Sequence, residues 1–185
     1  MTNDASSYRR YQNGDNDAFA LLVDEHYDAL VLYLNTFVHS LQTAEELAED
    51  TFVKIAVKKP NFKGKSSFRT WLFAIGSNTA KDYLRKTAKE KTVPLDEVSE
   101  FTPDDTEIET EYIKEERKTR LHRAMLKLKP EYRSVLWLVY FEDFSVDEAA
   151  ISMKKTRNST EHLLRRAKQA LKTELEKEGF TDEEP

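Results

Sequence analysis

The sequence contains no cysteine, so disulfides and zinc-thiolate sites are excluded and the chain suits a reducing cytoplasm. Glycine is scarce too, and Gly64 and Gly76 stand alone outside any phosphate-cradling loop. No pair of histidines has the helical spacing of a metal site. The histidines are scattered over distant segments: His26, His39, His122 and His162. These absences predict no enzyme, no cofactor and no metal centre.

Long hydrophobic runs are also missing. The best apolar stretch, Ala29 to Val38, is broken by Asn35 and Thr36 and reaches about half the length needed to span a bilayer. The first residues show neither a basic start nor an apolar core, so no secretion signal is predicted. We therefore expect a cytoplasmic protein without membrane insertion.

Charged residues are plentiful, and the net charge of the whole chain is −5. Along the sequence, acidic and basic blocks alternate. Residues 1–53 carry −8, residues 54–91 carry +9, residues 92–116 carry −9 and residues 117–185 carry +3. Because the Debye length is about 8 Å at physiological salt, an approaching polyanion responds mainly to the nearest block. The basic block is either a solvated surface or a nucleic-acid contact, and the aromatics and glycine within it favour the contact.

Apolar residues recur at three- and four-residue steps in the first half, which predicts three amphipathic helices. The first spans residues 17–38. The second starts at a capping box formed by Thr43 and Glu46 and ends at Pro60, and the third spans residues 67–86. These helices form a first domain, residues 17–87, after an N-terminal tail, residues 1–16.

Residues 88–116 combine two prolines with an acidic block and few large apolar side chains, which predicts a flexible linker. Beyond it, Pro130 begins a helix, and a capping box of Ser145 and Glu148 begins a short one. A tight turn and a long basic helix follow, the pattern of a helix-turn-helix, although any small helical bundle can imitate it. The second domain spans residues 117–178, before a C-terminal tail, residues 179–185. The predicted fold class is all-α, with two small helical domains.

The segment Phe62–Lys86, FKGKSSFRTWLFAIGSNTAKDYLRK, places lysines and aromatics in a short loop that leads into a helix with a basic end. Exposed aromatics give unstacked bases a surface, and lysines neutralise phosphates, so the segment suits single-stranded nucleic acid. Trp71 is open to two interpretations, a core residue or a base-stacking platform.

This segment resembles the promoter-melting segment of the extracytoplasmic-function (ECF, group 4) sigma factors of the sigma-70 family. AEELAEDTFVKIAV (Ala44–Val57) resembles the family's polymerase-clamping helix. LKPEYRSVLWLVYFEDFSVDEAAISM followed by KKTRNSTEHLLRRAKQAL resembles its C-terminal helix-turn-helix. The resemblance runs from about Asp17 to Leu175 and implies a transcription initiation subunit of RNA polymerase, with residues 17–87 as region 2 and residues 117–178 as region 4.

The resemblance also implies three sets of contact residues. Contacts to core polymerase fall on Glu45, Glu46, Glu49, Asp50 and Val53. Contacts to the minus-ten element fall on Asn61, Phe62, Lys63, Gly64, Lys65, Ser66, Ser67, Trp71, Ser77, Asn78, Lys81 and Arg85. Contacts to the minus-thirty-five element fall on Thr156, Arg157, Asn158, Ser159, Glu161, His162, Arg165 and Lys168. Helix-dipole stabilisation alone accounts for Glu45 and Glu46 better than for Glu49 and Asp50.

The implied partners are promoter DNA and the polymerase core, through the coiled coil of its largest subunit and its flap. An anti-sigma factor, the family's usual control, would be a further partner. The chain departs from the family at Lys154, where glycine is usual, and at Glu161, where a basic side chain is common. A stand-alone helix-turn-helix regulator is the alternative, but it leaves the aromatic-lysine loop and the acidic helix unexplained.

Overall fold

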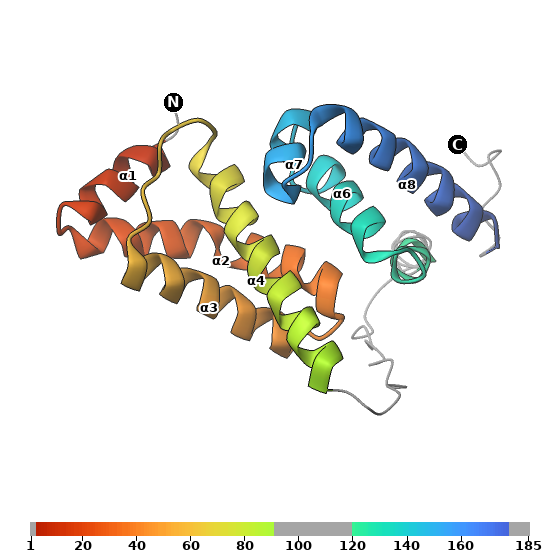
Figure 1. Cartoon of the computed structure of the whole chain (residues 1–185), viewed down its shortest axis with the longest axis horizontal. Helices are drawn as coiled ribbons and strands as arrows, with labels where there is room; N and C mark the ends of the chain where they lie inside the picture. Colours follow the sequence, from red (N-terminus) through yellow and green to blue (C-terminus); the bar gives the residue numbers. More distant parts are fainter. Residues whose placement is uncertain (1–2, 91–119, 178–185) are drawn as a thin grey trace, which may run out of the picture.

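The computed structural model describes residues 3–90 and 120–177, and all regular secondary structure within these ranges is helical (Figure 1). The N-terminal half holds α1 (Asn3–Gln12), α2 (Asn16–Val38), α3 (Leu41–Lys58) and α4 (Phe68–Glu90). The C-terminal half holds helical residues 120–126, then α6 (Pro130–Tyr140), α7 (Val146–Met153) and α8 (Arg157–Lys177). The all-α fold class is confirmed. Of the predicted linker, residues 91–116 lie outside the described residues.

Side-chain caps fix where the long helices begin. Asp15 caps α2 by accepting a hydrogen bond from the Ala18 amide at 3.1 Å. Ser40 caps α3, because its hydroxyl accepts from the Thr43 amide at 3.3 Å. The expected cap at Thr43 is therefore wrong: the helix starts earlier, and the Thr43 hydroxyl donates to Ser40 Oγ instead.

The N-terminal residues, expected to form a tail, contain helix α1. Tyr8 and Tyr11 are buried one helical turn apart. The Tyr8 hydroxyl donates to the Pro60 carbonyl and the Tyr11 hydroxyl to the Ala56 carbonyl, each at 2.8 Å. Burial, with a smaller effect of Tyr11, raises the pKa of Tyr8 to about 12, so this phenol stays a neutral donor at physiological pH. The helix thus fastens the N-terminus to the end of α3.

Turn and cap chemistry in the C-terminal half follows the sequence closely. Pro130 is the first residue of α6, where its missing amide costs no hydrogen bond. The capping box of α7 is complete: the Glu148 amide donates to Ser145 Oγ, and the Glu148 carboxylate accepts from the Ser145 amide. The predicted helix-turn-helix pair is therefore present as α7 and α8.

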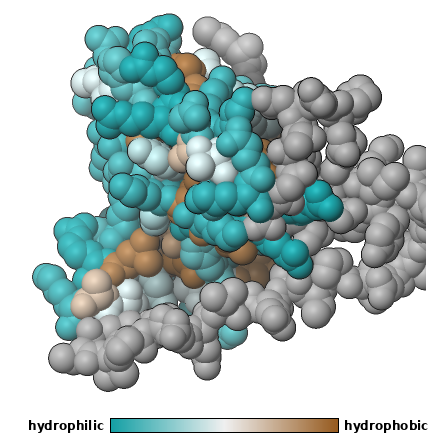
Figure 2. Space-filling model, turned by 90° about the vertical axis from the view of Figure 1, so that its right-hand side faces the viewer, coloured by the Kyte–Doolittle hydropathy of each residue, from teal (hydrophilic) through white to brown (hydrophobic). Residues whose placement is uncertain are grey.

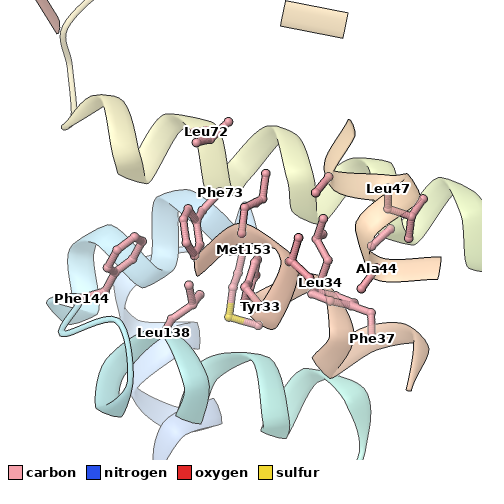
Figure 3. Close-up of a cluster of buried hydrophobic side chains, with 14 of the residues drawn as sticks. Tyr33, Leu34, Phe37, Ala44, Leu47, Leu72, Phe73, Leu138, Phe144 and Met153 are labelled. Atoms are coloured by element: carbon pink, nitrogen blue, oxygen red, sulfur yellow. The ribbon is translucent and has the colours of Figure 1, made fainter. Parts of the chain in front are cut away.

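The two halves share one hydrophobic core. Tyr33 of α2 stacks on Phe73 of α4, with ring centroids 5.1 Å apart, and Phe73 also contacts Phe144 of the C-terminal half at 5.3 Å. Leu138 and Met153 complete the cluster from the same side (Figure 3). Helix α4 packs on α7, and α2 packs on α6. The described residues therefore form a closed arrangement, a term used below for this packing of the two halves.

Close packing of α2 on α4 depends on Gly76. A Cβ at this position would lie 2.8 Å from Leu30 Cδ1 and 3.5 Å from Leu34 Cδ2, and both leucines are fully buried. We expect Gly76→Leu to lower the free energy of unfolding by about 3 kcal/mol, because overpacking forces the helices apart. Urea denaturation measures this loss. Ala88→Leu, at an exposed position of the same helix, is the control and should stay within about 0.5 kcal/mol of the wild type; equal effects would contradict the packing argument.

Candidate nucleic-acid and polymerase interfaces

The loop between α3 and α4 presents most of its predicted contact residues to solvent. The exposed ones are Asn61, Lys63, Gly64 and Lys65. Gly64 has φ +66, in the left-handed region that glycine tolerates without strain. Ser66 and Ser67 are half-buried, and Ser67 caps α4 by accepting a hydrogen bond from the Thr70 amide at 3.0 Å. The loop therefore exposes its lysines to solvent, while the Ser67 cap fixes the point where the loop joins α4.

Phe62 does not offer the loop an exposed ring. Its side chain is 7% exposed, with its ring centroid 5.3 Å from that of Trp71 and 6.0 Å from that of Phe68. Tyr8 of α1 closes the cluster, 5.2 Å from Trp71. Trp71 is half-buried, so it contributes to this cluster and keeps part of its surface accessible. The aromatic cluster therefore anchors the loop against the helices.

Helix α4 carries the other predicted minus-ten residues at different depths. Arg85 is exposed, whereas Ser77 is fully buried. Asn78 is half-buried and donates its amide to the Ala74 carbonyl at 2.6 Å. Burial lowers the pKa of Lys81, which also lies near Lys155 of the C-terminal half. In the closed arrangement only part of this helix face is open to solvent.

The outer face of α3 is acidic and exposed. Its members are Glu45, Glu46, Glu49, Asp50 and Val53. Val53 is 57% exposed, and Val57, one turn further, is 77% exposed. Burial and the neighbouring Glu49 and Glu45 raise the pKa of Tyr27 on α2. The face thus joins carboxylates to an apolar end and suits a basic, partly apolar partner surface.

The turn between α7 and α8 leads directly into a helix with an exposed polar face. Thr156, Arg157, Asn158, Ser159, Glu161, His162, Arg165 and Lys168 are all exposed. Arg157 Nε donates to Glu161 at 2.9 Å and Arg157 Nη1 to Asp147 at 2.6 Å. The Lys168 ammonium lies over the ring of Tyr140, 5.2 Å from its centroid. The first two turns of α8 therefore present one continuous polar surface. Lys168 lies further along the helix and contacts the Tyr140 ring instead.

Two family descriptions match the chain. Residues 22–90 match Sigma-70 region 2, and residues 118–171 match Sigma-70, region 4. RNA polymerase sigma factor YlaC of Bacillus subtilis is 31% identical over 162 residues, 87% of this chain and 94% of that protein. This chain belongs to the ECF sigma factors of the sigma-70 family. RNA polymerase sigma-H factor of Pseudomonas aeruginosa is 30% identical over 94% of each chain.

Solved structures share the fold of this sigma factor. CnrH in complex with the cytosolic domain of CnrY has a TM-score of 0.67 at 23% identity, covering 95% of this chain and 98% of the other. The sigma factor RpoE in complex with the anti-sigma factor NepR, from Bartonella quintana, has a TM-score of 0.67 at 22% identity, covering 85% and 96%. The arrangement of helices is therefore one that sigma factors adopt.

A groove that the sequence did not indicate lies on the C-terminal half of the sigma factor. It has a volume of about 480 Å³. Its apolar lining includes Leu121, Met125, Leu136, Leu171 and Leu175, contributed by residues 120–126, α6 and α8. Figure 2 shows hydrophobic surface between hydrophilic side chains on the side of the molecule that carries this half. Hydrophobic periodicity indicates that Leu121, Leu136 and Leu171 face a core, but it does not show that one side of this core stays open.

Helix α1 is a second feature that the sequence did not reveal. Asp4 and His26 are buried and lie 3.3 Å apart, Oδ2 to Nε2, which ties α1 to α2. Their ligand atoms and that of exposed Glu25 lie within 4.8 Å of one another. The direct contact of carboxylate and imidazole explains this group as a tie between helices.

None of the helices in the described ranges is both long and apolar enough to cross a membrane.

Lys154 ends α7 with φ 54 and ψ 45, a left-handed conformation that disfavours residues with a Cβ. Lys154, where the family resemblance led us to expect glycine, therefore adopts a backbone conformation that glycine tolerates better. We expect Lys154→Gly to raise the free energy of unfolding by about 1 kcal/mol, as measured by urea denaturation. Lys154→Ala removes the same charge but keeps the Cβ. If alanine stabilises the sigma factor as much as glycine, charge and not backbone strain is the cause.

Proposed function

We propose that this sigma factor binds core polymerase through the acidic face of α3, captures the melted minus-ten strand with the 61–67 loop and α4, and reads the minus-thirty-five element with α8. Residues 17–87 would act as region 2 and residues 117–178 as region 4. The observation that carries the proposal is the separation of an exposed acidic face from an exposed lysine loop within one half.

The core contact rests on charge and exposure. The carboxylates of Glu49 and Asp50 project beyond the first turn of α3, where the helix dipole no longer explains acidic residues. A basic coiled coil of the polymerase would meet these charges, and Val53 would add apolar contact at the rim. Complementary charge of this kind sets both the rate of association and the register of docking.

Strand capture would use the open part of the loop and helix. Lys63 and Lys65 would neutralise phosphates, while Asn61 and the accessible part of Trp71 would receive a base that leaves the stack. Flipping a base costs a few kcal/mol, and stacking with polar contacts returns about that much. The sigma factor would thus trap an opening of the duplex and supply no chemistry of its own.

The N-terminal turns of α8 would enter the major groove. Asn158, His162 and Arg165 are free of the ion pairs that join Arg157 to Glu161 and Asp147, and His162 and Arg165 contact each other at 3.0 Å. Polar side chains in the first turns of such a helix reach base edges. Glu161 would accept from cytosine N4 or orient Arg157, and its charge repels phosphate, so affinity for DNA should depend on the polymerase.

The apolar groove of the C-terminal half would receive the polymerase flap. Lys168 and Lys172 border the groove, and its floor is aliphatic, which fits an amphipathic helix with acidic flanks. An anti-sigma protein is a further proposed partner, because RpoE from Bartonella quintana was solved with the anti-sigma factor NepR. We place all of these contacts in the cytoplasm.

A pull-down with purified core polymerase tests the proposal. The immobilised sigma factor should retain core polymerase and, with it, promoter DNA. Binding should weaken steeply as salt rises, because each neutralised phosphate releases counterions. A chain that binds duplex DNA but never retains core polymerase would be a stand-alone regulator, and the proposal would fail.

A further inference from the structure

Helices α1 and α2 meet at a buried histidine and a buried carboxylate. Nε2 of His26 lies 3.3 Å from Oδ2 of Asp4, and the two side chains are only 6% and 8% exposed. Glu25 is exposed, and one of its carboxylate oxygens lies within 4.8 Å of both of these atoms. Three groups that can bind a metal therefore converge from two helices. Histidine spacing gives no sign of them, because Asp4 and His26 lie 22 positions apart and the group includes one histidine.

The distance between the two buried atoms suits a metal ion. Zn²⁺ binds imidazole nitrogen and carboxylate oxygen at about 2.0–2.2 Å in a tetrahedron, so two of its ligands lie about 3.3–3.6 Å apart. The separation of 3.3 Å between His26 and Asp4 falls on this edge, and it is slightly longer than the usual N–H···O hydrogen bond of about 2.7–3.2 Å. The exposed Glu25 side chain can turn to supply a third corner. An ion here would strengthen the tie between α1 and α2.

Packing holds the two buried ligands in place. The His26 ring lies against that of Phe68, with ring centroids 5.8 Å apart and an angle of 36° between the rings. Asp4 lies in the first turn of α1, whose position is fixed further along by the hydroxyl bonds of Tyr8 and Tyr11. Because both side chains are already ordered, an ion would bind them at little cost in conformational entropy.

A cavity of about 430 Å³ opens beside the three ligands. The carboxylates that line it are those of Asp4, Glu25, Glu142, Asp143 and Glu148. Against these five the lining has one guanidinium, that of Arg69, which forms an ion pair with Glu142. An excess of negative charge around a cavity raises the local concentration of cations. The cavity also leaves room for a water molecule at the fourth position of an ion.

We propose that Asp4, Glu25 and His26 form a binding site for one divalent transition-metal ion of the Zn²⁺ type. The donor set selects this class, because imidazole nitrogen suits Zn²⁺ and its neighbours, whereas Mg²⁺ and Ca²⁺ prefer oxygen ligands alone. The chain has no cysteine, so no thiolate competes for the ion elsewhere in the protein.

The ion would fix α1 against the loop between α3 and α4. Tyr8 lies one helical turn after Asp4, on the same side of α1. Its hydroxyl donates to the Pro60 carbonyl, and its ring lies 6.4 Å from that of Phe62 and 5.2 Å from that of Trp71. An ion that holds Asp4 would therefore hold the aromatic cluster that anchors the loop, and so favour strand capture. This consequence rests on the proposed function, whereas the site itself does not.

Titration of the full chain with Zn²⁺, against a chromogenic chelator, tests the site. We expect one ion per chain, which about a hundredfold excess of Mg²⁺ does not displace. His26→Ala should lower the affinity at least about a hundredfold, because even residues that only orient a metal ligand contribute about 10–100-fold. Glu25→Gln should lower it about tenfold. Hydrogen exchange of the α1 amides should slow at least about tenfold when Zn²⁺ is about a hundred times its dissociation constant, since the ion binds only the docked helix.

Two matched controls make the same changes at exposed positions outside the group. Asp24→Asn, one residue before Glu25, and His122→Ala should each keep the Zn²⁺ affinity within about twofold. A chain that binds no Zn²⁺, or equal losses with Glu25→Gln and Asp24→Asn, would overturn the site. Glu25→Gln decides the matter if His26→Ala does not fold, because Glu25 is exposed. These measurements use the chain without polymerase, so a failed pull-down would refute the proposed function and leave the metal site standing.

Discussion

Asp50→Lys is expected to weaken binding to core polymerase about a hundredfold while leaving the fold intact. Asp50 is exposed in the middle of the acidic face of α3, so a lysine there costs no buried contact. It places a positive charge against the basic surface that the face is proposed to meet, and like-charge juxtaposition at an interface costs several kcal/mol. Fluorescence anisotropy with labelled sigma factor measures the change in affinity.

Asp17→Lys is the matched control for this charge reversal. Asp17 is exposed on α2, ten residues or about 15 Å along the helix from Tyr27, which marks the edge of the acidic face. The reversal costs about 0.5 kcal/mol of stability at a helix N-terminus and should not change core affinity. Equal losses in both variants would indicate a general charge effect, and no loss with Asp50→Lys would remove α3 from the polymerase contact.

Lys65→Glu is expected to reduce formation of the open complex at least tenfold with core affinity unchanged. Lys65 is exposed in the loop beside Gly64 and is not one of the residues of the acidic face of α3. A carboxylate there repels the phosphates that the loop must hold while a base enters the pocket. Fluorescence of 2-aminopurine placed in the minus-ten element of a promoter reports the unstacking.

Two variants show whether this effect is specific to the loop. Lys89→Glu makes the same charge change within the same basic block, at an exposed position near the end of α4. This variant should reduce open-complex formation at most a few-fold. Asn61→Ala keeps the charge and removes a polar base contact, and it should lower open-complex formation as well. An equal loss with Lys65→Glu and Lys89→Glu would mean that the block attracts DNA without capturing a base.

Much of the local structure could be predicted because caps and periodicity act over a few residues. The capping box of Ser145 and Glu148 begins α7 as expected, and Pro130 begins α6. Ser40 replaced Thr43 as the cap of α3 because both hydroxyls lie within reach of the same helix start. Helix α1 escaped notice because its polar sequence buries few large side chains, and those find partners only in other elements, among them α2, α3, α4 and the loop between α3 and α4.

The contacts between the halves could not be predicted, because periodicity identifies an apolar face but not its partner. Ser77 was expected on the exposed side of α4 and is fully buried, with its side chain beside that of Tyr33 of α2. Arg69 and Glu142 are separated by 73 positions, and nothing local to either links them. The same limit applies to Phe62, whose loop position indicated exposure and whose ring packs under Trp71.

Permanganate footprinting of a promoter tests the central claim most directly, because it detects unpaired thymines. The promoter would come from start sites mapped when this sigma factor is overproduced. We expect thymines in the minus-ten element to react only when sigma factor and core polymerase are both present. Protection of duplex DNA by the sigma factor alone, with no reactive thymines after core polymerase is added, would contradict the account.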